Sequence, residues 1–330
     1  QVKAIGLDGQ SISAYSAPVP MEKAAQEMER YAPKIRVKYH EQNGTVLLYP
    51  AYSFVKIPHA VSYEVEITDE EPENPDGCEP SVHRISQGIV TIPELFDELP
   101  RQGTVWWRVR GLDENGGPVG VWSEAEKIVN DPAENWETGI LGDSISHGGG
   151  HISYGPADHE FSWLSYLDFP AINLSMSGDT SETMLERFEA DVLPFHPRYL
   201  LILNGTNSLR AGVSAAEVIA DLEELKARCL ANGIRPIFLT LPPINPENIA
   251  RAFDEPTADD WQTQFSLVNA FLRTEVHIDV AAAFSTHPLL PTELALDGLH
   301  EDVIGKQLIA QTVNRAWPEA KQQADRLPAQ

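Results

Sequence analysis

The pattern of apolar and polar positions divides the chain into two regions with different periods. Between about residue 40 and residue 130, short runs alternate large apolar with polar residues, which is typical of strands that bury one face. These runs are Tyr63–Thr68, Gly88–Ile92, Val105–Gly111 and Val119–Trp122. The segment Asp113–Gly117 (DENGG) supplies tight-turn residues between the last two. Residues 1–130 are therefore predicted to form a small antiparallel β-sandwich with an N-terminal extension, in which Met21–Tyr31 is expected to be helical.

The second region begins after a polar segment, Asn130–Asn135, which contains a proline and is expected to be a linker. Beyond it, short continuous apolar runs alternate with amphipathic helices. The runs are Gly139–Leu141, Ala171–Leu174, Tyr199–Leu203, Ile234–Leu241 and Val276–Val280. Buried strands separated by helices indicate a parallel sheet covered on both faces. We predict an α/β domain over residues 136–318 and a polar tail, exposed or frayed, over residues 319–330.

The clearest helix of the second region is Ser214–Ala231. Ser214 and Glu217 have the spacing of a capping box, and Gly233 follows the end of the helix. One apolar stripe along it is formed by Val218, Leu222, Leu225 and Cys229.

Composition narrows the set of partners. The formal net charge of −25 disfavours nucleic acid and acidic membrane surfaces, and it favours neutral or cationic substrates. No apolar run approaches the ~18 residues of a membrane span. Cys78 and Cys229 fall in different predicted domains, so no disulfide between them is expected. The oligomeric state has no signature in the sequence.

Four polar segments lie where an open α/β sheet gathers its functional groups, at the carboxyl ends of the strands. They are Gly142–Gly148 (GDSISHG), Asn173–Thr180 (NLSMSGDT), Asn204–Ser208 (NGTNS) and Asp297–His300 (DGLH). Each alone is a common string. Their occurrence in this order, each after a predicted strand or before the last helix, indicates a catalytic site.

The residue types in these segments fit acyl transfer. A serine hydroxyl such as that of Ser144 is a poor nucleophile until a base, here His300, takes its proton. Asp297 can hold the histidine in the required tautomer. Gly178 and the Asn207 amide can donate hydrogen bonds to the negative charge that develops on the substrate oxygen. As alternatives, each residue could be an ordinary loop or turn former.

These four segments closely resemble the motifs of the SGNH (GDSL-type) hydrolases over Gly139–Trp317. The resemblance implies a flavodoxin-like three-layer α/β fold with a parallel sheet. It also implies that Ser144 is the nucleophile, that Asp297 and His300 complete the triad, and that the Ser144 amide joins Gly178 and Asn207 in an oxyanion hole. No metal or organic cofactor is implied. Ser208 departs from the family, which often has aspartate there.

The histidines after Ser144 admit other interpretations. The string HGGG, His147–Gly150, mimics an oxyanion loop of α/β-hydrolase lipases, but there it precedes the nucleophile. A metal site could use His147, His151, Asp158 and His159. Three glycines between the first two histidines prevent a preset helical face, so we expect no metal. We instead predict a flexible substrate loop that contains His147 and His151.

The substrate is suggested by a weaker resemblance. Trp106–Glu124 (WWRVRGLDENGGPVGVWSE) is similar to the last strands of the fibronectin type III-like modules attached to bacterial polysaccharide-active enzymes. This favours a serine esterase that acts on short-chain, chiefly acetyl, esters of a small molecule or glycan, in a bacterial protein that is secreted or periplasmic. The cytoplasm is the alternative location. Trp163 and Trp261 could provide aromatic surface near the site or could be core residues.

Two alternative functions remain open at this point. The first is a lipolytic or thioesterase activity on longer acyl chains. The second is a non-catalytic glycan-binding protein whose α/β half is an inactive relic, although the four intact segments argue against it.

Overall fold

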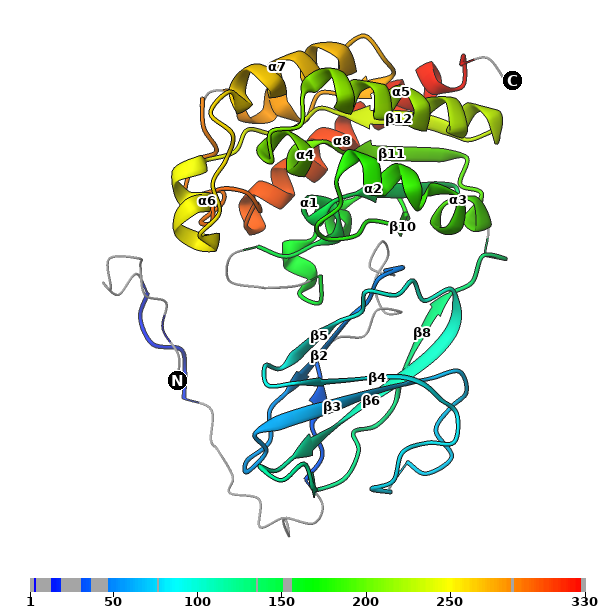
Figure 1. Cartoon of the computed structure of the whole chain (residues 1–330), viewed down its shortest axis with the longest axis vertical. Helices are drawn as coiled ribbons and strands as arrows, with labels where there is room; N and C mark the ends of the chain where they lie inside the picture. The colour runs from blue at the N-terminus through cyan, green and yellow to red at the C-terminus, as the bar shows by residue number, and fades with distance from the viewer. Residues whose placement is uncertain are drawn as a thin grey trace.

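The computed structural model describes residues 3, 13–18, 31–36, 47–75, 77–134, 136–150, 156–285 and 288–327. Figure 1 shows an α/β domain at the top and a β domain below it. The helix expected at Met21–Tyr31 lies, apart from Tyr31, outside the described residues. In the part of the chain that is described, no helix is long and apolar enough to cross a membrane.

The β domain is a sandwich of two antiparallel sheets. Its strands are β1 (Lys34–Ile35), β2 (Ala51–Val55), β3 (Ser62–Thr68), β4 (Arg84–Val90), β5 (Glu94–Phe96), β6 (Gly103–Leu112), β7 (Pro118–Val119) and β8 (Glu126–Asn130). One sheet has the order β1-β2-β5 and the other β4-β3-β6-β7, with β8 also paired to β6. Between them lies a core that includes Tyr52, Phe54, Tyr63, Val65 and Trp107. The predicted all-β architecture is confirmed, although only the first residue of the run Val119–Trp122 forms part of a strand.

The α/β domain is built on five parallel strands in the order β10-β9-β11-β12-β13. They are β9 (Thr138–Gly142), β10 (Ile172–Asn173), β11 (Tyr199–Leu203), β12 (Arg235–Leu239) and β13 (His277–Ile278). This is the flavodoxin-like order, in which the first strand lies between the second and the third. Every residue of β9 and β11 is buried, as expected for strands covered on both faces. The fold class predicted from the sequence is confirmed.

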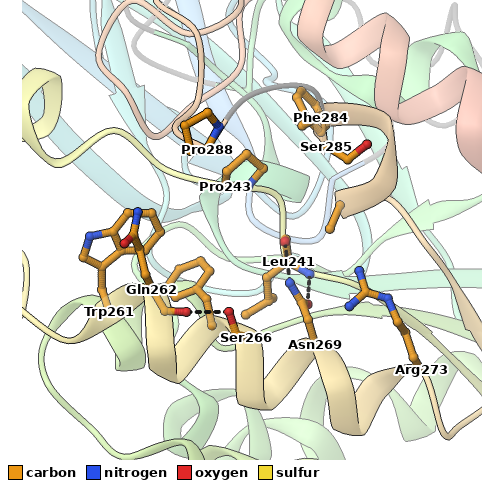
Figure 2. A pocket seen from close by; sticks show the side chains of 12 residues that line it. Leu241, Pro243, Trp261, Gln262, Ser266, Asn269, Arg273, Phe284, Ser285 and Pro288 are labelled. Carbon is orange, nitrogen blue, oxygen red and sulfur yellow. Dashed lines mark hydrogen bonds between the residues drawn. The ribbon is translucent and has the colours of Figure 1, made fainter.

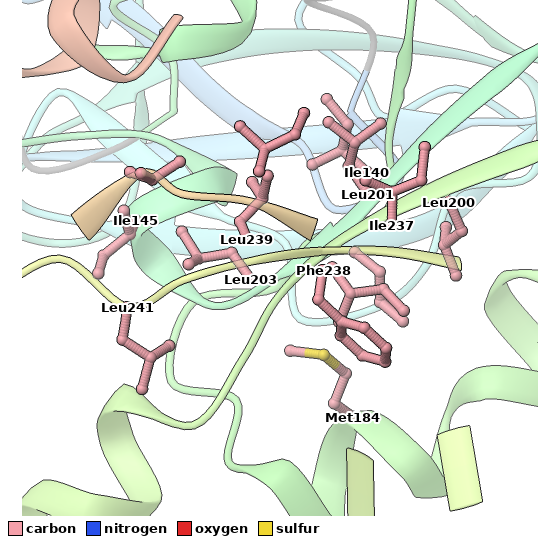
Figure 3. Packing of buried hydrophobic residues seen from close by; sticks show 14 of the residues in the cluster. Ile140, Ile145, Met184, Leu200, Leu201, Leu203, Ile237, Phe238, Leu239 and Leu241 are labelled. Atoms are coloured by element: carbon pink, nitrogen blue, oxygen red, sulfur yellow. The ribbon is translucent and has the colours of Figure 1, made fainter. Parts of the chain in front are cut away.

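Helices cover this sheet. They are α1 (Ser144–His147), α2 (Ser181–Glu186), α3 (Phe188–Asp191), α4 (Thr206–Arg210), α5 (Ala215–Ala231), α6 (Pro246–Phe253), α7 (Trp261–Leu272) and α8 (Val303–Ala324), with short 3-10 turns at His159–Phe161, Trp163–Tyr166, Leu193–Phe195 and Ala281–Phe284. Figure 3 shows side chains of β9, β11 and β12 meeting Met184 of α2 and Ile145 of α1 in the core. The capping box of Ser214 and Glu217 at the start of α5 is confirmed.

The C-terminal tail differs from the prediction. Residues 319–324 are not a frayed tail, because α8 continues through Pro318 to Ala324. Ala320 and Ala324 are buried with Trp317, and this packing outweighs the helix-breaking preference of a single proline. The expected linker is also shorter than predicted, since Asn130 ends β8 and its side-chain amide is buried.

The two domains are joined through a segment that precedes β2. Leu47 lies in the core of the β domain, whereas Leu48 and Tyr49 belong to the core of the α/β domain. Leu47 forms a parallel bridge with Asn173 of β10, and the Leu48 amide donates to the Asn173 carbonyl at 3.0 Å. The β domain therefore extends the edge of the parallel sheet.

Candidate active site

Ser144 lies at the carboxyl end of β9, as the first residue of α1. Asp143 caps this helix, because its side chain accepts a hydrogen bond from the Ile145 amide at 2.9 Å. The first amides of a helix have no partner within the helix, so the Ser144 N–H can face a ligand. A side chain at Gly142 would approach Ser146 Oγ within 2.7 Å, which requires glycine just before the turn. The sequence Gly-Asp-Ser thus forms a tight strand-to-helix turn that exposes the serine.

A chain of hydrogen bonds connects Ser144, His300 and Asp297. Ser144 Oγ lies 2.8 Å from His300 Nε2, and His300 Nδ1 lies 2.9 Å from Asp297 Oδ2. Because a carboxylate only accepts, Nδ1 carries the proton and Nε2 is free to accept from the serine. The other oxygen, Asp297 Oδ1, accepts from the amides of Leu299 and His300 at 2.8 Å each. The hydroxyl, imidazole and carboxylate have the order and spacing that nucleophilic catalysis by serine requires.

The carboxylate of Asp297 is held in its charged form. Burial on its own would raise the pKa of Asp297, but the hydrogen bonds and charge of His300 and the amide of Leu299 outweigh burial and lower it. A charged Asp297 can stabilise the imidazolium that forms when His300 takes a proton.

Gly178 and Asn207 line the same cavity as Ser144. Gly178 has φ of +90°, a conformation that favours glycine, although a Cβ there would meet nothing within 4 Å. Asn207 is in α4 after β11, and its Nδ2 donates to the Asp179 carbonyl at 2.9 Å. That bond uses one amide hydrogen and leaves the second for a ligand. The structure therefore brings together all five residues singled out in the four sequence segments.

The cavity has a volume of about 510 Å³ and is lined by both domains. Phe96 of β5 reaches it from the β domain, while Phe253, Arg210 and Glu255 come from the α/β domain. The Phe253 ring meets the His300 imidazole edge-on, with ring centroids 5.8 Å apart. These four residues were not foreseen from the sequence, because none belongs to a motif and Phe96 is about 50 residues from the nearest one.

Comparison with known proteins decides the family. The sequence profile of the GDSL-like lipase/acylhydrolase family matches residues 140–308, slightly more than half of the chain. The chain belongs to this family. It is accordingly a carboxylic ester hydrolase. No curated protein matches the chain.

Solved structures similar to this acylhydrolase share low sequence identity with it. A GDSL-like lipase from Bacteroides thetaiotaomicron is 18% identical, with 57% of this chain and 90% of that chain covered and a TM-score of 0.44. An acetylxylan esterase from Geobacillus stearothermophilus is 22% identical, with 54% and 92% covered and a TM-score of 0.42. An acylhydrolase from Bacteroides fragilis is 20% identical, with 57% of this chain and 92% of that chain covered and a TM-score of 0.45.

His147 does not lie in a flexible substrate loop, contrary to the prediction for this GDSL-type chain. It ends α1 and is buried. Its Nε2 lies 2.7 Å from the Tyr49 carbonyl and its Nδ1 lies 2.8 Å from Ser177 Oγ. Burial lowers the pKa of His147 to about 4, so the ring is neutral at neutral pH. The prediction for His147 failed because contacts with Tyr49 and Ser177, which are distant in the sequence, bury its ring. His151, the other residue of the predicted loop, lies outside the described residues.

The described part of the acylhydrolase offers no metal site. No group of three or more histidine, cysteine, aspartate or glutamate side chains within it could hold a metal ion. Asp158, one of the residues considered for a metal, instead pairs with Arg36 of the β domain.

Ser208, the position at which the family often has aspartate, links two loops of the site. Its Oγ accepts from the Ser181 amide at 2.8 Å and donates to Ser181 Oγ at 3.2 Å. The hydroxyl pair therefore ties the start of α2 to α4, next to Asn207.

The two tryptophans considered as substrate-facing surface are elsewhere. Trp163 is buried in the core, with its Nε1 3.4 Å from Ser146 Oγ. Trp261 borders a separate hollow of about 480 Å³, shown in Figure 2, which α7 lines together with the segment after β12. In this hollow the Asn269 side chain accepts from the Leu241 amide at 2.7 Å and donates to the Leu241 carbonyl at 3.0 Å. These bonds attach α7 to the segment after β12, so this face of α7 has a structural role.

Proposed function

We propose that the protein is a serine esterase in which Ser144 is the nucleophile, His300 the general base and Asp297 its orienting partner. The 2.8 Å contact between Ser144 Oγ and His300 Nε2, continued to Asp297 at 2.9 Å, is the observation that carries this proposal. His300 removes the hydroxyl proton as Ser144 Oγ attacks the ester carbonyl carbon. The tetrahedral intermediate then collapses, and the departing alcohol takes the proton from His300. Water attacks the acyl-enzyme by the same route and releases the carboxylic acid.

The negative charge of the intermediate falls on the former carbonyl oxygen. We assign its stabilisation to the amides of Ser144 and Gly178 and to Nδ2 of Asn207, because all three residues border the cavity. Fixed donors of this kind act without reorganisation during the reaction, and removing one typically lowers kcat by ~10²–10³-fold.

The proposed substrate is a short-chain ester, chiefly an acetate ester, of a carbohydrate. Phe96, Phe253 and the glycines at 148–150 form a wall near Ser144, while Arg210 and Glu255 supply polar groups to the same cavity. An apolar patch beside a few polar groups suits a small acyl group on a polyhydroxylated alcohol. The β domain, through Phe96, narrows the entrance without supplying a reacting group.

The test compares p-nitrophenyl acetate, p-nitrophenyl octanoate and an acetylated xylo-oligosaccharide. We expect turnover of both acetates and weak turnover of the octanoate. Ser144→Ala is expected to abolish all turnover in a folded protein. Ser266→Ala, which removes a hydroxyl from the exposed face of α7, is the matched control and is expected to keep wild-type kcat. Preferential turnover of octanoate would replace the acetyl assignment with a lipolytic one, and an active Ser144→Ala variant would refute the nucleophile assignment.

A further inference from the structure

Tyr49, in the segment that joins the two domains, is linked indirectly to the proposed oxyanion donors. The segment Leu47–Tyr49 runs beside β10, whose carboxyl end leads into the loop that carries Gly178. Tyr49 is buried, and both its backbone carbonyl and its phenol bind groups of the α/β domain. The two contacts lead to different donors.

The first path runs through His147. Since the Tyr49 carbonyl can only accept, His147 Nε2 carries the proton and donates to it. His147 Nδ1 is then an acceptor, and both the amide of Ser177 at 3.2 Å and its hydroxyl at 2.8 Å donate to it. Ser177 immediately precedes Gly178. A neutral histidine of fixed tautomer thus connects the backbone of the joining segment, two residues before β2, to the oxyanion loop.

The second path runs through the Tyr49 phenol. The hydroxyl donates to Asp191 Oδ2, and the ring lies 5.6 Å from the guanidinium of Arg187. Arg187 binds Asp191 at 3.0 Å and Asp179 at 2.6 Å. The carbonyl of Asp179 accepts the Nδ2 hydrogen of Asn207. The Asn207 side chain, our proposed donor to the substrate oxygen, is therefore oriented by Asp179. Tyr49 helps to hold Asp179 in place through Asp191 and Arg187.

We propose that Tyr49 and His147 are positioning residues, through which the β domain holds the Gly178 amide and the Asn207 side chain in place for the oxyanion. This inference rests on the proposed function, because it assigns a role to donors of that same site. It predicts that the β domain is part of the catalytic geometry in addition to being a wall of the cavity.

The experiment uses the full chain. Two substitutions of His147 each keep one of its two contacts and remove the other. His147→Gln can still reach the Tyr49 carbonyl from the Nε2 position, whereas His147→Asn can still accept from Ser177 at the Nδ1 position. Tyr49→Phe keeps the carbonyl contact and removes only the bond to Asp191. Gln102→Ala is the matched control, since Gln102 also donates across the domain boundary, to the Ala190 carbonyl at 2.8 Å, without contacting the Ser177–Gly178 loop.

Turnover of p-nitrophenyl acetate is measured for each protein. The rate is then divided by the fraction of molecules whose Ser144 has reacted with a fluorophosphonate once labelling is complete. We expect both His147 variants to lose about tenfold or more in kcat with little change in KM, because a misplaced donor weakens the transition state more than the bound substrate. Tyr49→Phe is expected to lose roughly threefold to tenfold, again in kcat, because an indirect contact contributes less than a donor itself. Gln102→Ala is expected to match the wild type.

A wild-type kcat in either folded His147 variant overturns the inference. This includes a variant in which KM rises while kcat stays unchanged. If the His147 variants do not fold, Tyr49→Phe decides: a reduced kcat supports the proposal and an unchanged kcat overturns it. The proposed function itself is refuted if the fluorophosphonate does not label Ser144 of the wild type, or if the Ser144→Ala variant is active. Both outcomes are distinct from those that overturn the role of His147 and Tyr49.

Discussion

Both domains bury ionised groups, but they do so in different ways. In the β domain, Glu66 and Arg108 are fully buried and bind each other at 2.8 Å on the outer face of the sheet. Glu64 pairs in the same way with Arg110 at 2.6 Å, and the Trp122 ring lies 4.6 Å from the guanidinium of Arg108. Each carboxylate faces an arginine in the adjacent strand, so a close ion pair opposes the desolvation of both groups, although burial still lowers the pKa of Arg108.

Behind Ser144 the buried charges are poorly matched. The oxygens of Glu301 have no hydrogen-bond partner among the described residues, and the Lys306 ammonium lies 3.5 Å away and donates to the Ile145 carbonyl at 2.7 Å instead. Burial raises the pKa of Glu301 and lowers that of Lys306. Burial also raises the pKa of Asp143, next to Ser144, to about 7. Groups with shifted pKa values often gather at functional sites, and here Asp143, Glu301 and Lys306 lie together next to Ser144.

The largest expected effect tests the functional side of this comparison. Asp297→Asn keeps the size of the side chain, but its amide can donate to His300 Nδ1 and so favours the tautomer that cannot accept from Ser144. We expect kcat to fall by ~10⁴-fold, as is typical for loss of the triad carboxylate, with the fold intact. The measurement is turnover of p-nitrophenyl acetate, with circular dichroism to check folding.

The control for this substitution is Asp279→Asn, which removes a charge that pairs with Arg273 at 2.9 Å, away from the site. Its kcat is expected to be unchanged. A folded Asp297→Asn variant with activity close to the wild type would mean that the 2.9 Å contact to His300 has no catalytic role.

The second effect tests the structural side. Glu66→Ala leaves Arg108 buried without its carboxylate, and breaking a buried pair costs about 3–5 kcal/mol of unfolding free energy. Urea denaturation followed by tryptophan fluorescence measures this loss. The exposed pair Arg251–Glu247 provides the control, because Glu247→Ala should cost about 0–1 kcal/mol. A loss no larger than that of the control would show that the Glu66–Arg108 pair does not stabilise the β domain.

The proposed catalytic residues could be predicted from the sequence because Ser144, Gly178 and Asn207 follow strands of the parallel sheet, while Asp297 and His300 precede the last helix. Strand runs such as Tyr199–Leu203 are read from local periodicity, and a parallel sheet brings their carboxyl ends together whatever the details of packing. The segments that carry Gly178 and Asn207 can be located in this way without knowledge of any distance, whereas the choice of these two residues within them rests on the resemblance to the SGNH hydrolases. Burial, by contrast, depends on the whole fold, and His147 was misplaced for that reason.

No pattern in the sequence marks the contacts between the domains as the apolar runs mark the strands. The Tyr49 carbonyl that binds His147 is a backbone atom, so no residue type marks it. Strand β2 (AYSFV) was also not foreseen, because four of its five residues are buried and the alternation that reveals a half-exposed strand is absent. Long-range packing, as at Pro318 in α8, overrode the local preference that suggested an end to the helix.

The smallest expected effect concerns Asp143 and the pH dependence of stability. The folded-state pKa of about 7 lies above the ~3.9 of an unfolded aspartate, so the folded protein retains a proton that the unfolded chain releases. Stability from this group is fully present below about pH 4 and is lost as the pH rises through 7, by about 2–3 kcal/mol between pH 5 and pH 8. Asp143→Asn cannot ionise and can still cap α1. The unfolding free energy of this variant should therefore rise relative to that of the wild type between pH 5 and pH 8 and then level off.

Urea midpoints at each pH measure the difference in unfolding free energy between the two proteins. This difference isolates Asp143 from His147 and Glu94, because their shifted pKa values are common to both proteins. A difference that stays constant over this range would show that Asp143 is ionised in the folded protein throughout, and the contrast between matched and mismatched buried charges would then rest on Glu301 and Lys306 alone.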